Sequence, residues 1–274
     1  MSFGILVGMN RITKRFDDLR ARNAKGLVIY IGAGDPDLGT TCKLAEAFSD
    51  VGVDVLELGV PFSDPLADGP VNQLSAQRGL ASGTTPARVL ETVRAIRSVS
   101  QIPLVLYIYY NLMHRRGVAQ FVREAASAGV DGLLVLDLPP EEGGEYLRLM
   151  REAGMSAIHL VAPTTPEDRI ARIARTASGF IYCVSREGVT GIQNQVSQHV
   201  PRLVASVRRH TDLPIAVGFG ISNPDQARAV AAHADAVVVG SAVVRLVETH
   251  AATPDVVGKV REFVSSLLNA IRRT

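Results

Sequence analysis

Two acidic side chains stand out because the sequence around them is apolar or conformationally stiff. Glu57 lies in the apolar run DVLELG at 54–59, and Asp68 follows in the stretch PFSDPLADGP at 61–70. A buried carboxylate costs free energy unless it is paired or takes part in a reaction. The alternatives are an internal salt bridge for Glu57 and a simple turn before Gly69 for Asp68. We favour a catalytic pair, in which one carboxyl transfers a proton and the other steadies positive charge.

The remaining sequence offers no evident electron sink for breaking a carbon–carbon bond. The usual choices are a lysine Schiff base and a metal ion. The lysines all lie in predicted helices or before the first predicted strand (Lys14, Lys25, Lys43, Lys259). The histidines have no paired ligand spacing, and His159 is interpreted as a satisfied core residue. We therefore expect no metal site and a lyase whose substrate carries its own electron sink.

Glycines after the last three predicted strands favour a phosphate-binding site. Strand seven ends in Gly218-Phe219-Gly220, and strand eight ends in Gly240-Ser241 at the start of a helix. Glycine lets the backbone approach an anion closely, and Ser241 can cap the helix or donate to the phosphate. A third segment, Gly188-Val189-Thr190-Gly191, follows strand six. The alternative for any one of these segments is a simple turn, but together they indicate a phosphorylated small molecule.

The elements that must position these residues are eight short apolar runs separated by amphipathic helical stretches. Such continuous apolar runs are typical of parallel strands that are covered on both faces. They lie at 27–32, 54–59, 103–108, 132–136, 155–160, 179–184, 213–218 and 235–239. Eight units predict an α/β fold, a (β/α)8 TIM barrel whose active site lies at the C-terminal ends of the strands. We expect one domain, 1–274, with extra helices around 9–22 and 254–272 that cap the ends of the barrel.

Composition narrows the class of protein further. Lys+Arg 29 against Asp+Glu 27 leaves a net charge of +2, and the basic residues are dispersed, which argues against nucleic acid. No apolar run reaches the roughly 20 residues that span a bilayer, so we expect no membrane partner. The opening MSFGILVGMN does not resemble a signal peptide. Cys42 and Cys183 fall in an expected helix and strand, typical of small buried thiols in a reducing cytoplasm.

Six motifs spread over almost the whole chain closely resemble the α subunit of tryptophan synthase. They are LELGVPFSDPLADGPV (56–71), GDP (34–36), DLPPEE (137–142), SREGVTG (185–191), GFGIS (218–222) and GSAVV (240–244). The resemblance implies retro-aldol cleavage of indole-3-glycerol phosphate to indole and glyceraldehyde 3-phosphate, a step of tryptophan biosynthesis. Indole itself is then the electron sink. This agrees with the lysine and histidine positions, which offer no electron sink from the protein.

The resemblance also implies roles for individual residues. Glu57 would protonate indole C3 and handle the proton of the adjacent hydroxyl, and Asp68 would stabilise charge at the ring nitrogen. Substrate would be held by Tyr109, Tyr182, Thr190, Gly191, Gly218, Phe219, Gly220, Gly240 and Ser241. Barrel packing is the alternative for the two tyrosines. The loop 185–191 would close over substrate and bring Thr190 near Asp68.

The implied partner is a pyridoxal-phosphate β subunit in an α2β2 complex, while this chain itself binds no cofactor. The positions that match partner contacts are Pro61, Asp64, Asn111 and Pro139, although Asp64 alone is also interpreted as structural. Four positions depart from the family's usual pattern: Gly32, Asn72, Tyr110 and Glu187. The main alternative is a free-standing lyase that acts without a β subunit. Less favoured alternatives are a non-catalytic phosphate-binding barrel and a sugar-phosphate isomerase, which leaves the PFSDPLADGP loop unexplained.

Overall fold

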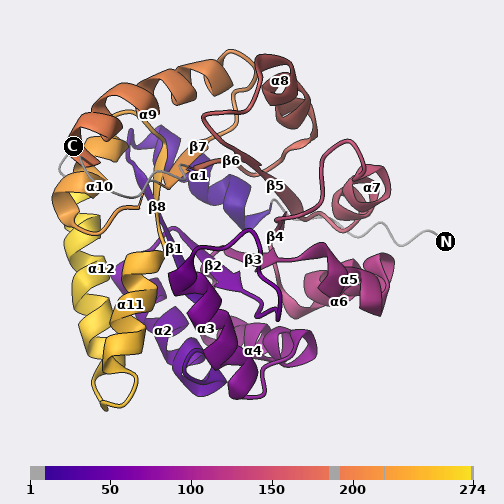
Figure 1. Ribbon diagram of the computed structural model, residues 1–274, viewed down its shortest axis with the longest axis vertical. Helices are drawn as coiled ribbons and strands as arrows, with labels where there is room; N and C mark the ends of the chain where they lie inside the picture. Colours follow the sequence, from indigo (N-terminus) through magenta and orange to yellow (C-terminus); the bar gives the residue numbers. More distant parts are fainter. Residues whose placement is uncertain (1–9, 185–191, 219, 273–274) are drawn as a thin grey trace.

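The strands form a closed parallel barrel in which neighbours follow chain order from β1 to β8 (Figure 1). A computed structural model describes residues 10–184, 192–218 and 220–272. The strands are β1 (Gly26–Gly32), β2 (Val55–Gly59), β3 (Leu104–Ile108), β4 (Gly132–Val135), β5 (Ser156–Val161), β6 (Ile181–Val184), β7 (Ile215–Gly218) and β8 (Ala236–Val239). The predicted (β/α)8 barrel is confirmed, and each strand boundary lies within two residues of the apolar run that predicted it.

Helices surround the barrel and cover the outward faces of its strands (Figure 1). They are α1 (Arg11–Ala21), α2 (Leu38–Val51), α3 (Pro70–Ala81), α4 (Pro86–Val99), α5 (Tyr110–Arg116), α6 (Val118–Ala128), α7 (Gly144–Glu152), α8 (Glu167–Thr176), α9 (Ile192–Arg208), α10 (Pro224–Ala231), α11 (Ser241–His250) and α12 (Val256–Arg272). Several begin with a proline in the first turn, where its missing N–H leaves no intrahelical bond unmade. Pro70 is one of these and is the first residue of α3, directly after the loop that carries Asp68.

Two hydrophobic clusters divide the core. The inner cluster fills the barrel with small and branched side chains such as Val28, Val105 and Ala216, and three residues of α1 extend it. Those residues, Ile12, Phe16 and Leu19, are buried, so α1 closes the N-terminal end of the barrel as predicted. The outer cluster joins the outward faces of the strands to the helices.

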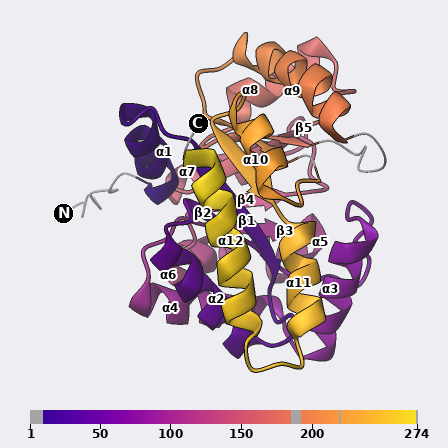
Figure 2. The same ribbon diagram turned by 90° about the vertical axis from the view of Figure 1, so that its left-hand side faces the viewer.

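The C-terminal helix does not cap the barrel, and this part of the prediction is wrong. The buried face of α12 belongs to the outer cluster. α12 lies alongside α2, α10 and α11, as Figure 2 shows. Its amphipathic pattern was visible in the sequence, but the pattern does not distinguish a helix across an end from one along the side.

Four paired contacts repeat around the N-terminal rim of the barrel, and we call them the lower-rim pairs. In each pair a side-chain oxygen just before an even-numbered strand accepts the backbone N–H at the start of the preceding odd-numbered strand, at 2.8 Å. The backbone N–H of the same polar residue donates back to the carbonyl of its partner. The pairs are Asp54 with Leu27, Asp131 with Leu104, Ser178 with Ala157 and Asp235 with Ile215.

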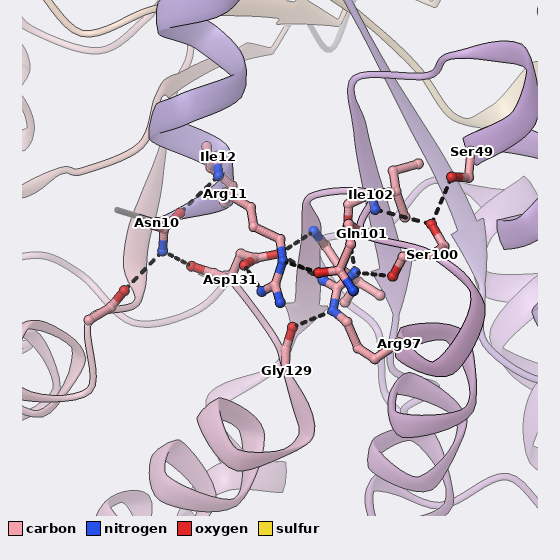
Figure 3. A network of polar contacts seen from close by, with 12 residues as sticks. Asn10, Arg11, Ile12, Ser49, Arg97, Ser100, Gln101, Ile102, Gly129 and Asp131 are labelled. Carbon is pink, nitrogen blue, oxygen red and sulfur yellow. Dashed lines mark hydrogen bonds and ion pairs between the residues drawn. The ribbon is translucent and has the colours of Figure 1, made fainter. Parts of the chain in front are cut away.

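Asp131 also fastens α1 to the barrel (Figure 3). Its carboxylate accepts from Arg11 Nη1 at 2.8 Å and Arg97 Nη2 at 2.7 Å. Asn10 donates to the carbonyls of Asp131 and Gly154, and its side-chain oxygen caps α1 by accepting from the Ile12 N–H. A buried carboxylate with a charged donor on each oxygen and a backbone donor on one of them is well compensated. The closed lower end leaves the opposite end, where the strands finish, for the site.

Two further sequence predictions concern cysteines and membranes. Both cysteines are free thiols. Cys183 is buried in β6 as expected, whereas Cys42 in α2 is only half-buried. No helix among the described residues combines the length and apolarity needed to cross a membrane.

Candidate active site

Glu57 lies on the inner face of β2 and is completely buried. Within the described part of the chain neither carboxylate oxygen has a hydrogen-bond partner. Burial without compensation raises the pKa of Glu57 from 4.5 to about 8, because the charged form loses its hydration and gains nothing in return. The salt-bridge interpretation of Glu57 is therefore wrong. At neutral pH this carboxyl holds a proton that it can donate.

Asp68 is the opposite kind of acid, because donors surround its carboxylate. Tyr107 Oη donates to Oδ1 at 2.7 Å, Tyr109 Oη donates to Oδ2 at 2.9 Å, and Asn72 Nδ2 lies 3.5 Å from Oδ1. Partial burial raises the pKa of Asp68, and these three hydrogen bonds oppose that rise. The main chain around Asp68 is also fixed, since its N–H donates to the Pro65 carbonyl at 3.0 Å.

Four tyrosines bring the two acids into one site. Tyr107 and Tyr109 contact Asp68 directly, and both acid charges raise the pKa of Tyr30 and of Tyr182, although burial is the larger cause. The Tyr30 and Tyr107 rings meet edge-on, with centroids 5.0 Å apart. Asp68, Tyr30, Tyr107 and Tyr109 all line a pocket at the ends of β1, β2 and β3.

Strand register explains why sequence analysis missed Tyr30 and Tyr107 as site residues. Tyr30 is the partner of Glu57 across β1 and β2, and Tyr107 is the partner of Gly59 across β2 and β3. All three side chains point into the barrel, and the missing side chain of Gly59 makes room for Tyr30. A Cβ at Gly59 would lie 2.3 Å from Tyr30 Oη. The signal was available, because residues at the level of Glu57 on neighbouring strands share its inward direction.

The glycines predicted to hold phosphate lie at the ends of β7 and β8. Gly218 ends β7, and a Cβ there would lie 2.8 Å from Tyr182 Oη. Gly220 has a φ of 62°, in the left-handed region that favours glycine. Gly240 is the N-cap residue of α11 and Ser241 is its first helical residue. Ser241 lies inside the helix and not at its N-cap position, so its expected capping role is wrong, while its donation to phosphate stays a prediction.

Three predicted substrate contacts, Thr190, Gly191 and Phe219, lie outside the described residues, as does Glu187. Tyr109 is buried and Tyr182 half-buried, both at the upper end of the barrel. Substrate contact by these residues and by the described glycines stays a prediction.

His159 is the histidine considered as a metal ligand or a core residue. His159 is buried in β5, but its Nε2 has no partner within the described ranges, so its interpretation as a satisfied core residue is wrong. Burial lowers the pKa of His159 to about 4, which keeps the ring neutral. The described residues contain no group of three or more His, Cys, Asp or Glu side chains placed to hold a metal ion.

Comparison with known proteins gives the same family as the motifs. A family model described as Tryptophan synthase alpha chain matches residues 16–272. A tryptophan synthase alpha chain from Opitutus terrae is 50% identical over 266 residues, 97% of this chain and all of the relative. One from Geobacter sulfurreducens is 48% identical, covering 96% of this chain and 99% of the relative.

The chain belongs to the tryptophan synthase alpha chain family. Solved structures agree with this assignment. Tryptophan synthase subunit alpha from Legionella pneumophila superposes with a TM-score of 0.89 and 37% identity, covering 97% of this chain and 100% of the other. A ligand-free tryptophan synthase from M. tuberculosis gives 0.86 and 33%, covering 96% and 99%. The family predicted from the motifs is thereby confirmed.

One departure from the usual pattern of the tryptophan synthase α family has a structural explanation. Gly32 ends β1, and a Cβ there would lie 2.2 Å from Ser75 Oγ. Ser75 in α3 uses that hydroxyl to donate to Asp35 Oδ2 at 2.6 Å. Arg78 completes the set with two bonds of 2.8 Å to the same buried carboxylate. A hydroxyl from α3 thus occupies the space that a larger residue at position 32 would fill.

The losses of stability caused by substitutions at Gly32 and Ser75 are expected to be strongly non-additive. Gly32→Thr alone should destabilise the protein by about 1–3 kcal/mol through overpacking. Ser75→Ala alone should cost about 1–3 kcal/mol because Asp35 loses a buried donor. Urea unfolding of the double variant should show a loss well below the sum, because the alanine admits the threonine. Additive losses would contradict the explanation.

Asn72 and Tyr110, two other departures from the family pattern, have different surroundings. Asn72 Nδ2 faces Asp68, while its Oδ1 is buried with no partner among the described residues. The Tyr110 ring packs against the His114 ring, with centroids 5.9 Å apart. The backbone N–H of Tyr110 donates to the Asp137 carboxylate at 2.6 Å. Asn72 therefore belongs to the surroundings of Asp68, whereas Tyr110, the first residue of α5, contacts His114 in the same helix and Asp137 after β4.

Proposed function

We propose that this chain is a lyase that cleaves indole-3-glycerol phosphate to indole and glyceraldehyde 3-phosphate, as the α subunit of tryptophan synthase in tryptophan biosynthesis. The single observation that carries the chemistry is the contrast between the two acids. Glu57 is buried, unpartnered among the described residues and protonated at neutral pH, while Asp68 accepts donors on both carboxylate oxygens. Two acids in such different environments can take different roles in one proton-transfer reaction.

Each acid has a defined task in the proposed reaction. Glu57 gives its proton to indole C3, which places positive charge on the ring nitrogen that Asp68 faces. The proton of the side-chain hydroxyl next to C3 is then removed, again by Glu57, as its oxygen becomes the aldehyde carbonyl. The carbon–carbon bond breaks and its electron pair returns to the ring, which neutralises the nitrogen. Protons and electrons balance without another reagent.

The phosphate end of the substrate is proposed to lie against the backbone of Gly218, Gly220 and Gly240, with Ser241 as a further donor. α11 supports this placement, because its N-cap residue is Gly240, which has no side chain to cap the N–H groups of the first turn at the positive end of the helix. The close approaches of Gly218 to Tyr182 and of Gly240 to Tyr30 support a phosphate end near the two acids, because both tyrosines lie in their electrostatic surroundings. Substrate bound here would span from β7 and β8 to β2.

The partner is proposed to be a tryptophan synthase β subunit, which would supply pyridoxal phosphate in an α2β2 complex. Two M. tuberculosis structures that resemble this chain were crystallised as tryptophan synthase, which supports this proposal. Asp64, in the loop after β2, and Asn111, in the first turn of α5 after β3, are exposed. Pro139, in the loop after β4, is half-buried, whereas Pro61 is buried. We propose that the chain itself needs no cofactor and acts in the cytoplasm.

The deciding experiment is indole release from indole-3-glycerol phosphate by the purified chain, measured with and without its cognate β subunit. We expect release in both conditions, and faster release in the complex. The Glu57→Gln variant serves as the enzyme-dependent blank. Absence of release in both conditions would overturn the lyase, while rapid release that the β subunit leaves unchanged would favour the free-standing enzyme.

A further inference from the structure

Asp68 comes from a loop, yet its carboxylate is held by the wall of the barrel. Leu66, near the tip of the loop that follows β2, is 90% exposed. Tyr107, in contrast, is part of β3 and projects inward from the sheet. The 2.7 Å bond from Tyr107 Oη to Asp68 Oδ1 is the shorter of the two phenol contacts. A rigid strand therefore supplies the donor that fixes the loop acid.

The second phenol is held differently. Tyr109 Oη donates to Asp68 Oδ2 and accepts the Ala67 N–H at 3.0 Å, so this hydroxyl bridges two neighbouring residues of the same loop. The Tyr109 ring packs against Phe62, another loop residue, at 5.0 Å between centroids. Tyr109 thus ties the loop to the start of α5. Of the two phenols, Tyr107 connects the carboxylate to the barrel interior, because its ring meets Tyr30 and not the loop.

Ordinary packing does not account for the Tyr107 hydroxyl. The inner cluster at lower levels of the barrel is filled with valine, leucine, alanine and phenylalanine, which need no polar partner. A buried hydroxyl costs free energy unless it is bonded, and here its partner is a carboxylate carried by a different element. Burial and the nearby Asp68 carboxylate raise the pKa of Tyr107 well above its usual value, so the hydroxyl keeps the proton that it donates to Asp68.

We propose that Tyr107 is a positioning residue for the lyase reaction, fixing Asp68 Oδ1 so that the carboxylate is in place before substrate arrives. This inference rests on the proposed function. Each carboxylate oxygen then has its own phenol, which sets both the direction and the plane of the group. Preorganised charge stabilises a developing cation without reorganisation during the reaction. Asn72 adds a weaker contact to the same Oδ1.

Tyr107→Phe keeps the ring and its contact with Tyr30 and removes only the hydroxyl. We expect kcat for indole release to fall by about ten- to a hundredfold, the effect of losing one hydrogen bond to a charged group, with a much smaller change in KM. In the Asp68→Asn background the same substitution should cost little, because Tyr107 acts through the carboxylate. Tyr146→Phe is the matched control, since Tyr146 is buried in α7 and its hydroxyl lies 3.4 Å from the Leu133 carbonyl.

A second measurement does not depend on activity. Loss of a donor to the carboxylate should raise the pKa of Asp68, and carboxyl carbon NMR titration would detect this in Tyr107→Phe but not in Tyr146→Phe. The other titratable groups around Asp68 are Tyr109, Glu57, Tyr30 and Tyr182. They are the same in both variants, so the comparison isolates the hydroxyl.

The outcomes are separable. An inactive wild type with a shifted Asp68 pKa in Tyr107→Phe would overturn the proposed function and leave the contact intact. An active wild type, with neither kcat nor the Asp68 pKa changed by Tyr107→Phe, would overturn the positioning role. If Tyr107→Phe does not fold, Tyr107→Leu removes the same donor and is judged by the same two measurements.

Discussion

Replacement of Glu57 by glutamine is expected to lower kcat by about three orders of magnitude, since the amide keeps the shape of the side chain but cannot transfer the proton. Because Glu57 must start protonated, kcat/KM of the wild type should decline above about pH 8, the value to which burial raises its pKa. Glu91→Gln, which removes an exposed acid from α4, is the control. A variant that retains a tenth or more of wild-type kcat would have lost roughly the contribution of a single hydrogen bond. That result would exclude Glu57 as the acid.

The same substitution should change how stability depends on pH. Between pH 4.5 and about 8 the folded protein keeps the Glu57 proton while the unfolded chain has lost it. The free energy of unfolding therefore declines by about 1.4 kcal/mol per pH unit from this group as the pH rises through that window. Glu57→Gln should lack this decline and exceed the wild type in stability near pH 8. Urea unfolding at several pH values measures it, and parallel curves would show that Glu57 ionises normally in the folded protein.

Asp68→Asn is expected to lower kcat about a hundred- to a thousandfold with little change in KM, because the charge that faces the ring nitrogen is lost. The amide also presents an N–H₂ group to one of two phenols that now donate to carboxylate oxygens. Asp64→Asn is a matched control from the same loop, because Asp64 is exposed and its side chain accepts from Ser63 at 2.5 Å. A similar loss in both variants would point to a general effect on the loop instead of a role for Asp68.

The acids could be predicted from the sequence, whereas most of their surroundings could not. Glu57 interrupts an apolar strand, and Asp68 lies in a specific loop motif, so residue type and position were enough. Tyr107 also lies in an apolar strand, but tyrosine is ordinary there. Its importance depends on where a loop from β2 returns over β3, which periodicity does not encode.

The way in which Ser75 fills the space left by Gly32 could not be predicted from the sequence either. Gly32 stood out as a departure, but the explanation lies in Ser75, on a helix whose packing against the end of β1 is known only from the fold. The unpartnered Nε2 of His159, judged within the described ranges, likewise depends on neighbours from other elements. Strand positions, by contrast, were predicted closely, because continuous apolar runs of this length have few other interpretations in a repeating βα pattern.

The lower-rim pairs divide the barrel into modules of two strands. Each pair joins an odd strand to the even strand that follows it, from β1 with β2 to β7 with β8. None of the four crosses from one module to the next. The polar residue is an aspartate in three of the modules and Ser178 in the module of β5 and β6. The hydrogen-bond geometry is therefore shared by all four, while the negative charge is not. A break in the chain placed between modules would leave every one of these pairs within a single fragment, which makes those boundaries the natural places to divide or permute this barrel.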